Sequence, residues 1–217
     1  YDIHSYVSRF DWTPDSTMIF EGGAVGQVDR ISDFINYLKV WEDGARLQGN
    51  KPFFFTEMGT MANGFGGDNP GVAMYKSLLK DVQLVLRFSQ IGIDGFARWN
   101  FVNRGNLDGP WQMVDTWDQE KNSLLPSGNY APHANNYYMW GLLTRFTSKG
   151  SEIIKTDVSG GNDGKFQRVF STTYRSPKNK NYSVFITNDS EQEYETTVSL
   201  NKLLGKKFFK YEINEKE

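Results

Sequence analysis

The sequence predicts an α/β fold, with parallel βαβ units in residues 1–150 and a small, incomplete antiparallel β-sandwich domain in residues 151–217. Two observations support this. Over the first hundred residues, apolar runs typical of buried strands alternate with helical stripes, and such alternation implies right-handed βαβ units on a parallel sheet. After Ser151 the hydrophobic period changes from helical to alternating, which is typical of antiparallel strands.

The first segment is predicted to run strand, helix, strand, helix, strand. The strands are placed at residues 1–7, at the Phe-rich run 53–57, and at residues 93–101. The helices between them are predicted from apolar residues three and four positions apart. They are Val28, Ile31, Phe34, Ile35, Leu38 and Trp41 in the first helix, and Val72, Tyr75, Leu78, Leu79, Val82, Val85 and Leu86 in the second.

The rest of the chain is predicted to hold one more helix and four strands. A polar insertion over residues 102–132 precedes a helix at 134–146, where Tyr138, Leu142 and Phe146 recur at four-residue spacing. Turn-forming residues then separate alternating stretches. The predicted strands cover 166–174, 182–187, 194–200 and 208–213.

Composition excludes several classes of function. The chain has 217 residues, with 24 Lys and Arg against 26 Asp and Glu, so it lacks the basic field that a nucleic-acid binder needs. No apolar run approaches the roughly 20 residues of a membrane span. The absence of cysteine rules out disulfides, zinc–thiolate centres, iron–sulfur clusters and cysteine nucleophiles. No metal or cofactor is expected.

Polar and aromatic residues recur near the carboxyl ends of the three predicted parallel strands. His4 and Tyr6 are two residues apart and share one strand face, Glu57 ends the second strand, and Trp99 lies in the third. A carboxylate at the end of an apolar run is costly to place without a role. Singly, Glu57 is equally well explained as a turn cap and His4 as a core histidine. Their recurrence on successive strands favours a catalytic site.

In this order and spacing, His4-Ser5-Tyr6, Phe54-Phe55-Thr56-Glu57 and Trp99 resemble strands six to eight of a clan A glycoside hydrolase. Family 5, the cellulase-like family, is nearest, and families 30 and 39 are similar enough to stay open. The resemblance covers residues 1–150 and implies the last three βα units of a TIM (β/α)8 barrel. The segment after residue 150 is similar to the C-terminal β domains that such enzymes often carry.

The resemblance implies hydrolysis of a β-linked polysaccharide or oligosaccharide by a retaining double displacement. Glu57 would be the nucleophile, Tyr6 would orient it, and His4 would hydrogen-bond the acid/base or a sugar hydroxyl. Trp99 offers a flat apolar surface for a pyranose ring. Asn100 and the loop residues Asp108 and Trp111 are candidate substrate-binding residues. A solvated loop explains the last two equally well.

The chain departs from the family pattern in one respect. The acid/base glutamate of the family lies in an Asn-Glu pair on the fourth strand, and the sole such pair here, Asn214-Glu215, lies in the tail. Glu21, in a Gly-rich loop, is a weaker substitute. We therefore expect the chain alone to be inactive on natural glycans, and to associate with a missing barrel half or with itself.

Two further expectations complete the sequence interpretation. An extracellular or periplasmic location, in a bacterium, suits a cysteine-free enzyme of this kind. The alternative function is a non-catalytic carbohydrate-binding or degenerate barrel fragment, with Trp99, Trp111 and Trp117 as its platform.

Overall fold

The computed structural model describes residues 2–8, 31–61, 75–102, 112–118, 120–163, 166–188, 190, 192–200 and 207–214. The longer elements are β1 (Asp2–Ser8), α1 (Ile31–Leu47), β2 (Phe54–Met61), α2 (Tyr75–Gln90), β3 (Gly95–Arg98), α3 (Ala134–Phe146), β11 (Val169–Arg175) and β12 (Tyr182–Asn188). The short strands are β4 (Val114–Asp115), β5 (Trp117–Asp118), β6 (Ser123–Leu124), β7 (Ala131–Pro132), β8 (Glu152–Ile154), β9 (Asn162–Asp163) and β10 (Phe166–Gln167).

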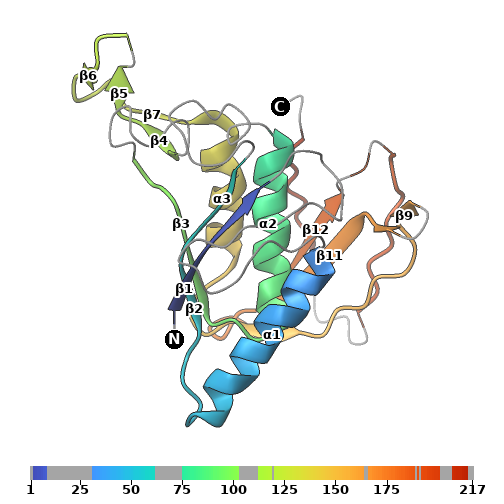
Figure 1. The fold of residues 1–217 in the computed structure, drawn as a ribbon. Helices are drawn as coiled ribbons and strands as arrows, with labels where there is room; N and C mark the ends of the chain where they lie inside the picture. Colours follow the sequence, from blue (N-terminus) through green and yellow to red (C-terminus); the bar gives the residue numbers. More distant parts are fainter. Residues whose placement is uncertain are drawn as a thin grey trace.

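The first three strands form a parallel sheet in the order β1-β2-β3, which confirms the predicted alternation of strands and helices (Figure 1). The boundaries differ from the prediction. Strand β2 continues four residues beyond Glu57, to Met61, and β3 ends at Arg98, one residue before Trp99. The described strands do not close into a barrel, so the molecule is a mixed α/β fold and the barrel stays a prediction.

Helix α2 covers one face of this sheet. Phe53, Phe55 and Met58 are each 1% exposed, and the ring of Phe55 stacks on Phe88 of α2 at a centroid distance of 4.7 Å. Phe88 also stacks on Phe96 of β3, at 6.0 Å. Aromatic pairs at such distances add to the free energy gained by burying their area. The core of the fold therefore lies between α2 and strands β2 and β3.

Helix α1 (Ile31–Leu47) continues through Gly44 without a break. It ends at Leu47, and Gly49 and Asn50 follow with φ angles of 91° and 55°, which lie in the left-handed region. Glycine, and less often asparagine, adopts that conformation at helix ends. The Gly49-Asn50 pair, and not Gly44, therefore marks the point where the chain leaves the helix.

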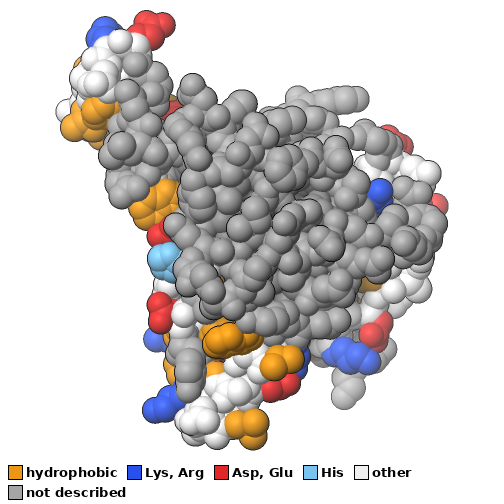
Figure 2. Space-filling view, in the orientation of Figure 1, with side chains coloured by type: hydrophobic (Ala, Val, Ile, Leu, Met, Phe, Trp, Pro, Cys, Tyr) orange, Lys and Arg blue, Asp and Glu red, His pale blue; other side chains and the backbone are white. Residues whose placement is uncertain are grey.

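The outer side of α1 carries an apolar surface. Val40, Trp41 and Leu47 are 70%, 42% and 86% exposed. A shallow depression of about 240 Å³ lies between Val40, Trp41, Gly44, Ala45 and Gln48. Figure 2 shows hydrophobic side chains gathered over the lower end of this helix.

None of the helices in the described ranges is both long and apolar enough to span a bilayer.

The C-terminal segment contributes a three-stranded antiparallel sheet in the order β12-β11-β8. The strands predicted at 166–174 and 182–187 are confirmed, although the first is divided into β10 and β11. Those predicted at 194–200 and 208–213 are wrong, because both segments lack strand pairing in the structure. Alternation alone indicated them, and a strand forms only where a neighbour pairs with it.

The antiparallel sheet packs on α2. The hydroxyl of Tyr174 donates to Ser89 Oγ at 2.8 Å, and the hydroxyl of Thr172 donates to the carbonyl of Leu86 at 3.0 Å. Tyr174 belongs to the same apolar core as the parallel sheet. Helix α2 is thus shared by both sheets, and the predicted domain boundary at residue 150 stays a prediction.

Candidate active site on the parallel sheet

A β-bulge in β2 places the predicted nucleophile. Ile3 of β1 pairs with Phe55, but His4, the next residue, pairs with Glu57, so β2 has one extra residue at this point. The same irregularity recurs against β3, where Phe55 pairs with Phe96 and Met58 with Arg98. Bulges are over-represented near active sites, because they re-aim a side chain.

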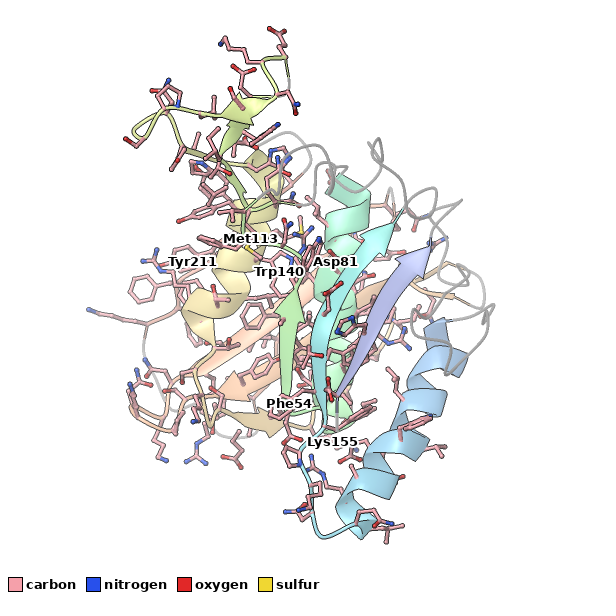
Figure 3. The ribbon with its side chains drawn as sticks, turned by 60° about the vertical axis from the view of Figure 1, so that its left-hand side comes forward. Phe54, Asp81, Met113, Trp140, Lys155 and Tyr211 are labelled. Carbon is pink, nitrogen blue, oxygen red and sulfur yellow. The ribbon has the colours of Figure 1, made fainter. Side chains whose placement is uncertain are left out.

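The bulge changes which residues face α2. Before it, Phe53 and Phe55 are buried and Phe54 between them is 38% exposed. After it, Met58 is buried, so Thr56 and Glu57 both escape the core. We call the sheet surface opposite α2 the open face. In Figure 3 this face is turned toward the viewer and α2 lies behind the strands.

The open face brings His4 and Glu57 together. His4 Nδ1 lies 3.8 Å from Glu57 Oε2, and the two side chains are 45% and 23% exposed. At this separation the two side chains form an ion pair when the imidazole is protonated, but the atoms are too far apart for a hydrogen bond. Asp2, two residues before His4, accepts a hydrogen bond of 3.1 Å from the Thr56 hydroxyl. Glu57 is thus the more buried of two carboxylates that the described residues place on this face.

The backbone of Trp99 is hydrogen-bonded to β2 next to Glu57. Its N–H donates to the carbonyl of Met58, the residue after Glu57, at 2.9 Å. Arg98, the last residue of β3, is buried on the α2 side, and strand alternation continued by one residue would direct Trp99 toward the open face. The peptide bond between Trp99 and Asn100 is cis, and Asn100 is 7% exposed. Its carbonyl accepts a hydrogen bond from Met113 at 3.1 Å.

The remaining predicted residues have different outcomes. Tyr6 lies in β1, in register with Gly59 of β2. Asp108, Trp111 and the weaker candidate Glu21 lie outside the described residues. Trp117 lies on β5, which projects with β6 away from the parallel sheet in both Figure 1 and Figure 3.

Two charged clusters near the end of β3 were not predicted. Arg98 binds Asp81 and Asn136 in the interior, and His133 pairs with Asp115 at 2.9 Å. The first cluster left a signal in the sequence, because Asp81 lies on the apolar stripe of its helix, among Leu78, Val82 and Val85. A charged residue at such a position needs a buried partner.

The described ranges hold no group of three or more His, Asp or Glu side chains arranged to bind a metal ion. No acid/base residue for the hydrolysis expected from the sequence is identified within these ranges. Neighbouring parallel strands thus hold one half-buried carboxylate with a histidine beside it, and an aromatic residue follows directly after the end of the third strand.

No protein-family model matches the chain, and no curated protein matches it. Solved structures similar to it include SrfJ from Salmonella typhimurium, at 14% identity and a TM-score of 0.41, covering 72% of this chain and 36% of that one. Another is a β-glucosidase from Exiguobacterium marinum, at 14% identity and a TM-score of 0.34, covering 68% and 35%. The chain thus spans about a third of the length of these proteins. Such distant likenesses carry no argument about its function.

Proposed function

We propose that the chain is part of a glycoside hydrolase that cleaves β-linked glycans by a retaining double displacement, with Glu57 as the nucleophile. The observation that carries the proposal is the position of Glu57. A bulge in the parallel strand β2 turns this carboxylate away from the apolar core, beside His4. The next residue, Met58, accepts a hydrogen bond from the backbone N–H of Trp99.

The reaction has two steps in this proposal. A carboxylate oxygen of Glu57 bonds to the anomeric carbon while the bond from that carbon to the leaving oxygen breaks, and an acid protonates the leaving oxygen. Water then bonds to the same carbon, gives its proton to the conjugate base of that acid, and releases Glu57. Retaining enzymes hold the two carboxyl groups about 5–5.5 Å apart. The family resemblance places the acid on an earlier strand.

The other open-face residues assist binding and orientation. His4 stands against Glu57 and is suited to hold its orientation or to bind a sugar hydroxyl. Tyr6, on the same strand, is proposed as the second orienting residue. Trp99 supplies the stacking surface, and Asn100, Asp108 and Trp111 are proposed to line the substrate site. An extracellular or periplasmic location remains part of the proposal.

The test replaces Glu57 by glutamine in the full-length protein. Glu57→Gln keeps the shape of the side chain and removes its negative charge, so hydrolysis of β-glycosides is expected to fall by several orders of magnitude while glycan binding persists. The matched control is Asp2→Asn, which neutralises the exposed carboxylate on the same face. Its turnover should stay near that of the unmodified protein.

Near-normal turnover by Glu57→Gln would remove the assignment. A wild-type protein that binds glycans without hydrolysing them would instead support the non-catalytic alternative.

A further inference from the structure

A buried ion pair involves Arg98, the last residue of β3 and the neighbour of Trp99 in the chain. The Nε atom of Arg98 donates to Asp81 Oδ2 at 3.2 Å, and the two side chains are 0% and 1% exposed. Asp81 belongs to α2 and Arg98 to β3. Burying two charges costs several kcal/mol per ion, and replacing such a pair by apolar residues is often neutral or stabilising. Stability alone therefore gives little reason for this pair.

The network continues into α3 and the segment beyond the strand. The Nη2 atom of Arg98 donates to Asn136 Oδ1 at 3.2 Å, and Asn136 Nδ2 donates to the carbonyl of Gln112 at 2.8 Å. Gln112 precedes Met113, whose N–H is shared between the carbonyls of Asn100 and Phe101, both at 3.1 Å. The chain on both sides of Trp99 is thus attached to one hydrogen-bonded network.

The geometry of the Arg98 guanidinium suits it to join two helices. Arginine presents its donors in a planar fork, so one side chain fixes two partners at a set angle, whereas lysine acts as a point charge. Arg98 uses the fork to hold an oxygen from each of two helices. Since Arg98 precedes Trp99 in the chain, fixing Arg98 fixes where the next residue leaves the strand.

We propose that Arg98, held by Asp81 and Asn136, is a positioning residue that sets the orientation of Trp99 on the open face. The inference rests on the proposed function insofar as Trp99 is taken as the sugar platform. The placement of Trp99 by Arg98 can, however, be measured without any glycan.

The first test observes Trp99 directly. The full chain is labelled with 5-fluorotryptophan, and the fluorine NMR signal of Trp99 is identified by its loss in Trp99→Phe. In Arg98→Lys, and in Asn136→Ala, which leaves the Arg98–Asp81 pair in place, the Trp99 signal should shift or broaden. The signal of Trp41, on the outer side of α1, should not move. If Arg98→Lys fails to fold, the result is read from Asn136→Ala.

The second test measures binding of cellotetraose, xylotetraose and laminaritetraose by calorimetry. For whichever of these binds, Asn136→Ala should raise the dissociation constant about two- to tenfold, in the range expected for coupled neighbours. The same substitution in a Trp99→Ala background should have no further effect. If none of the three binds the wild-type protein, the proposed function is weakened and the NMR test alone decides the positioning claim.

The control for both tests is Tyr174→Phe, which removes another buried hydrogen bond of α2, on the side of the antiparallel sheet. It should lower thermal stability and leave both the Trp99 signal and glycan binding unchanged. An unmoved Trp99 signal in Asn136→Ala would overturn the proposal. The proposal would also be overturned if Asn136→Ala and Trp99→Ala weakened glycan binding additively in the double variant.

Discussion

At the scale of single residues, the open face depends on one extra residue in β2. Without a bulge, alternation would put Thr56 on the open face and Glu57 in the core beside Phe55. The bulge places both Thr56 and Glu57 outside the core, and the burial of Met58 restores the pattern afterwards. As a result, the Glu57 carboxylate contacts His4, and the Glu57 side chain is 23% exposed.

The first residue-scale prediction concerns Trp99. Trp99→Ala should weaken glycan binding by about 1–3 kcal/mol, the free energy gained by burying an apolar side chain of this kind. Calorimetric titration measures the change. Trp41→Ala removes a tryptophan from the outer side of α1 and serves as the control, with unchanged binding expected. A collapse of thermal stability in Trp99→Ala with unaltered binding would make Trp99 a core residue.

At the scale of elements, α2 is the helix on which the other elements meet. It packs on β2 through Phe88, on α3, and on β11 through the hydroxyls of Thr172 and Tyr174. Its apolar stripe is strong enough to be read from the sequence. The helix and the antiparallel strands β11 and β12 were therefore predicted, whereas the packing of these strands on α2 was not.

A pH-dependent prediction follows for Tyr174. Burial raises the pKa of its phenol above the usual 10.0, although the hydrogen bond with Ser89 opposes the rise. Above about pH 10 the unfolded chain loses this proton and the native state keeps it, so the free energy of unfolding falls as pH rises further. Tyr174→Phe should lack this contribution.

The measurement is urea unfolding of both proteins at about pH 8 and about pH 11, conditions on either side of the ordinary phenol pKa. Near pH 8 the variant should be about 1 kcal/mol less stable, the usual value of one hydrogen bond. The difference in free energy of unfolding between the two proteins should be smaller at the higher pH. Equal pH slopes for the two proteins would contradict the account of Tyr174.

Elements with a strong, local pattern were predictable, and those that depend on distant partners were not. The Phe-rich run 53–57 and the stripe of α2 specify a strand and a helix by themselves. Residues 194–200 alternate as clearly as β12 does, but no described strand pairs with them. A sequence pattern indicates which residues suit a strand and leaves open whether a neighbour is present.

The candidate site was predictable to a similar degree. His4, Glu57 and Trp99 were placed on successive parallel strands, and register brings His4 opposite Glu57. The bulge could not be foreseen, because it is a mismatch between two strands far apart in sequence. The position of Asp81 on an apolar stripe indicates that it needs a buried partner, but that this partner is Arg98, 17 residues away, depends on how α2 packs on the sheet.

At the scale of the whole molecule, one apolar core joins both sheets. Phe55, Phe88 and Tyr174 all belong to it, although they come from the parallel sheet, α2 and the antiparallel sheet. The chain is therefore expected to unfold as one cooperative unit, despite the change of pattern after residue 150. The association predicted from the sequence stays a prediction.

Phe88→Ala tests this cooperativity. Phe88 is 1% exposed between two aromatic rings, so its removal should lower the free energy of unfolding by about 3–5 kcal/mol. Tryptophan fluorescence and far-ultraviolet circular dichroism should report the same single, shifted transition. Val40→Ala, at a position 70% exposed, should change little. Two separate transitions, one unaffected by Phe88→Ala, would show two independent domains.

The central claim is that Glu57 forms a covalent bond with the anomeric carbon. A 2,4-dinitrophenyl 2-deoxy-2-fluoro-β-glycoside tests it most directly, because its activated leaving group departs without a proton donor while the fluorine slows release of the intermediate. We predict that mass spectrometry of the digested protein finds one added sugar on the peptide with Glu57, and none in Glu57→Gln. A sugar attached to any other carboxylate would contradict the account.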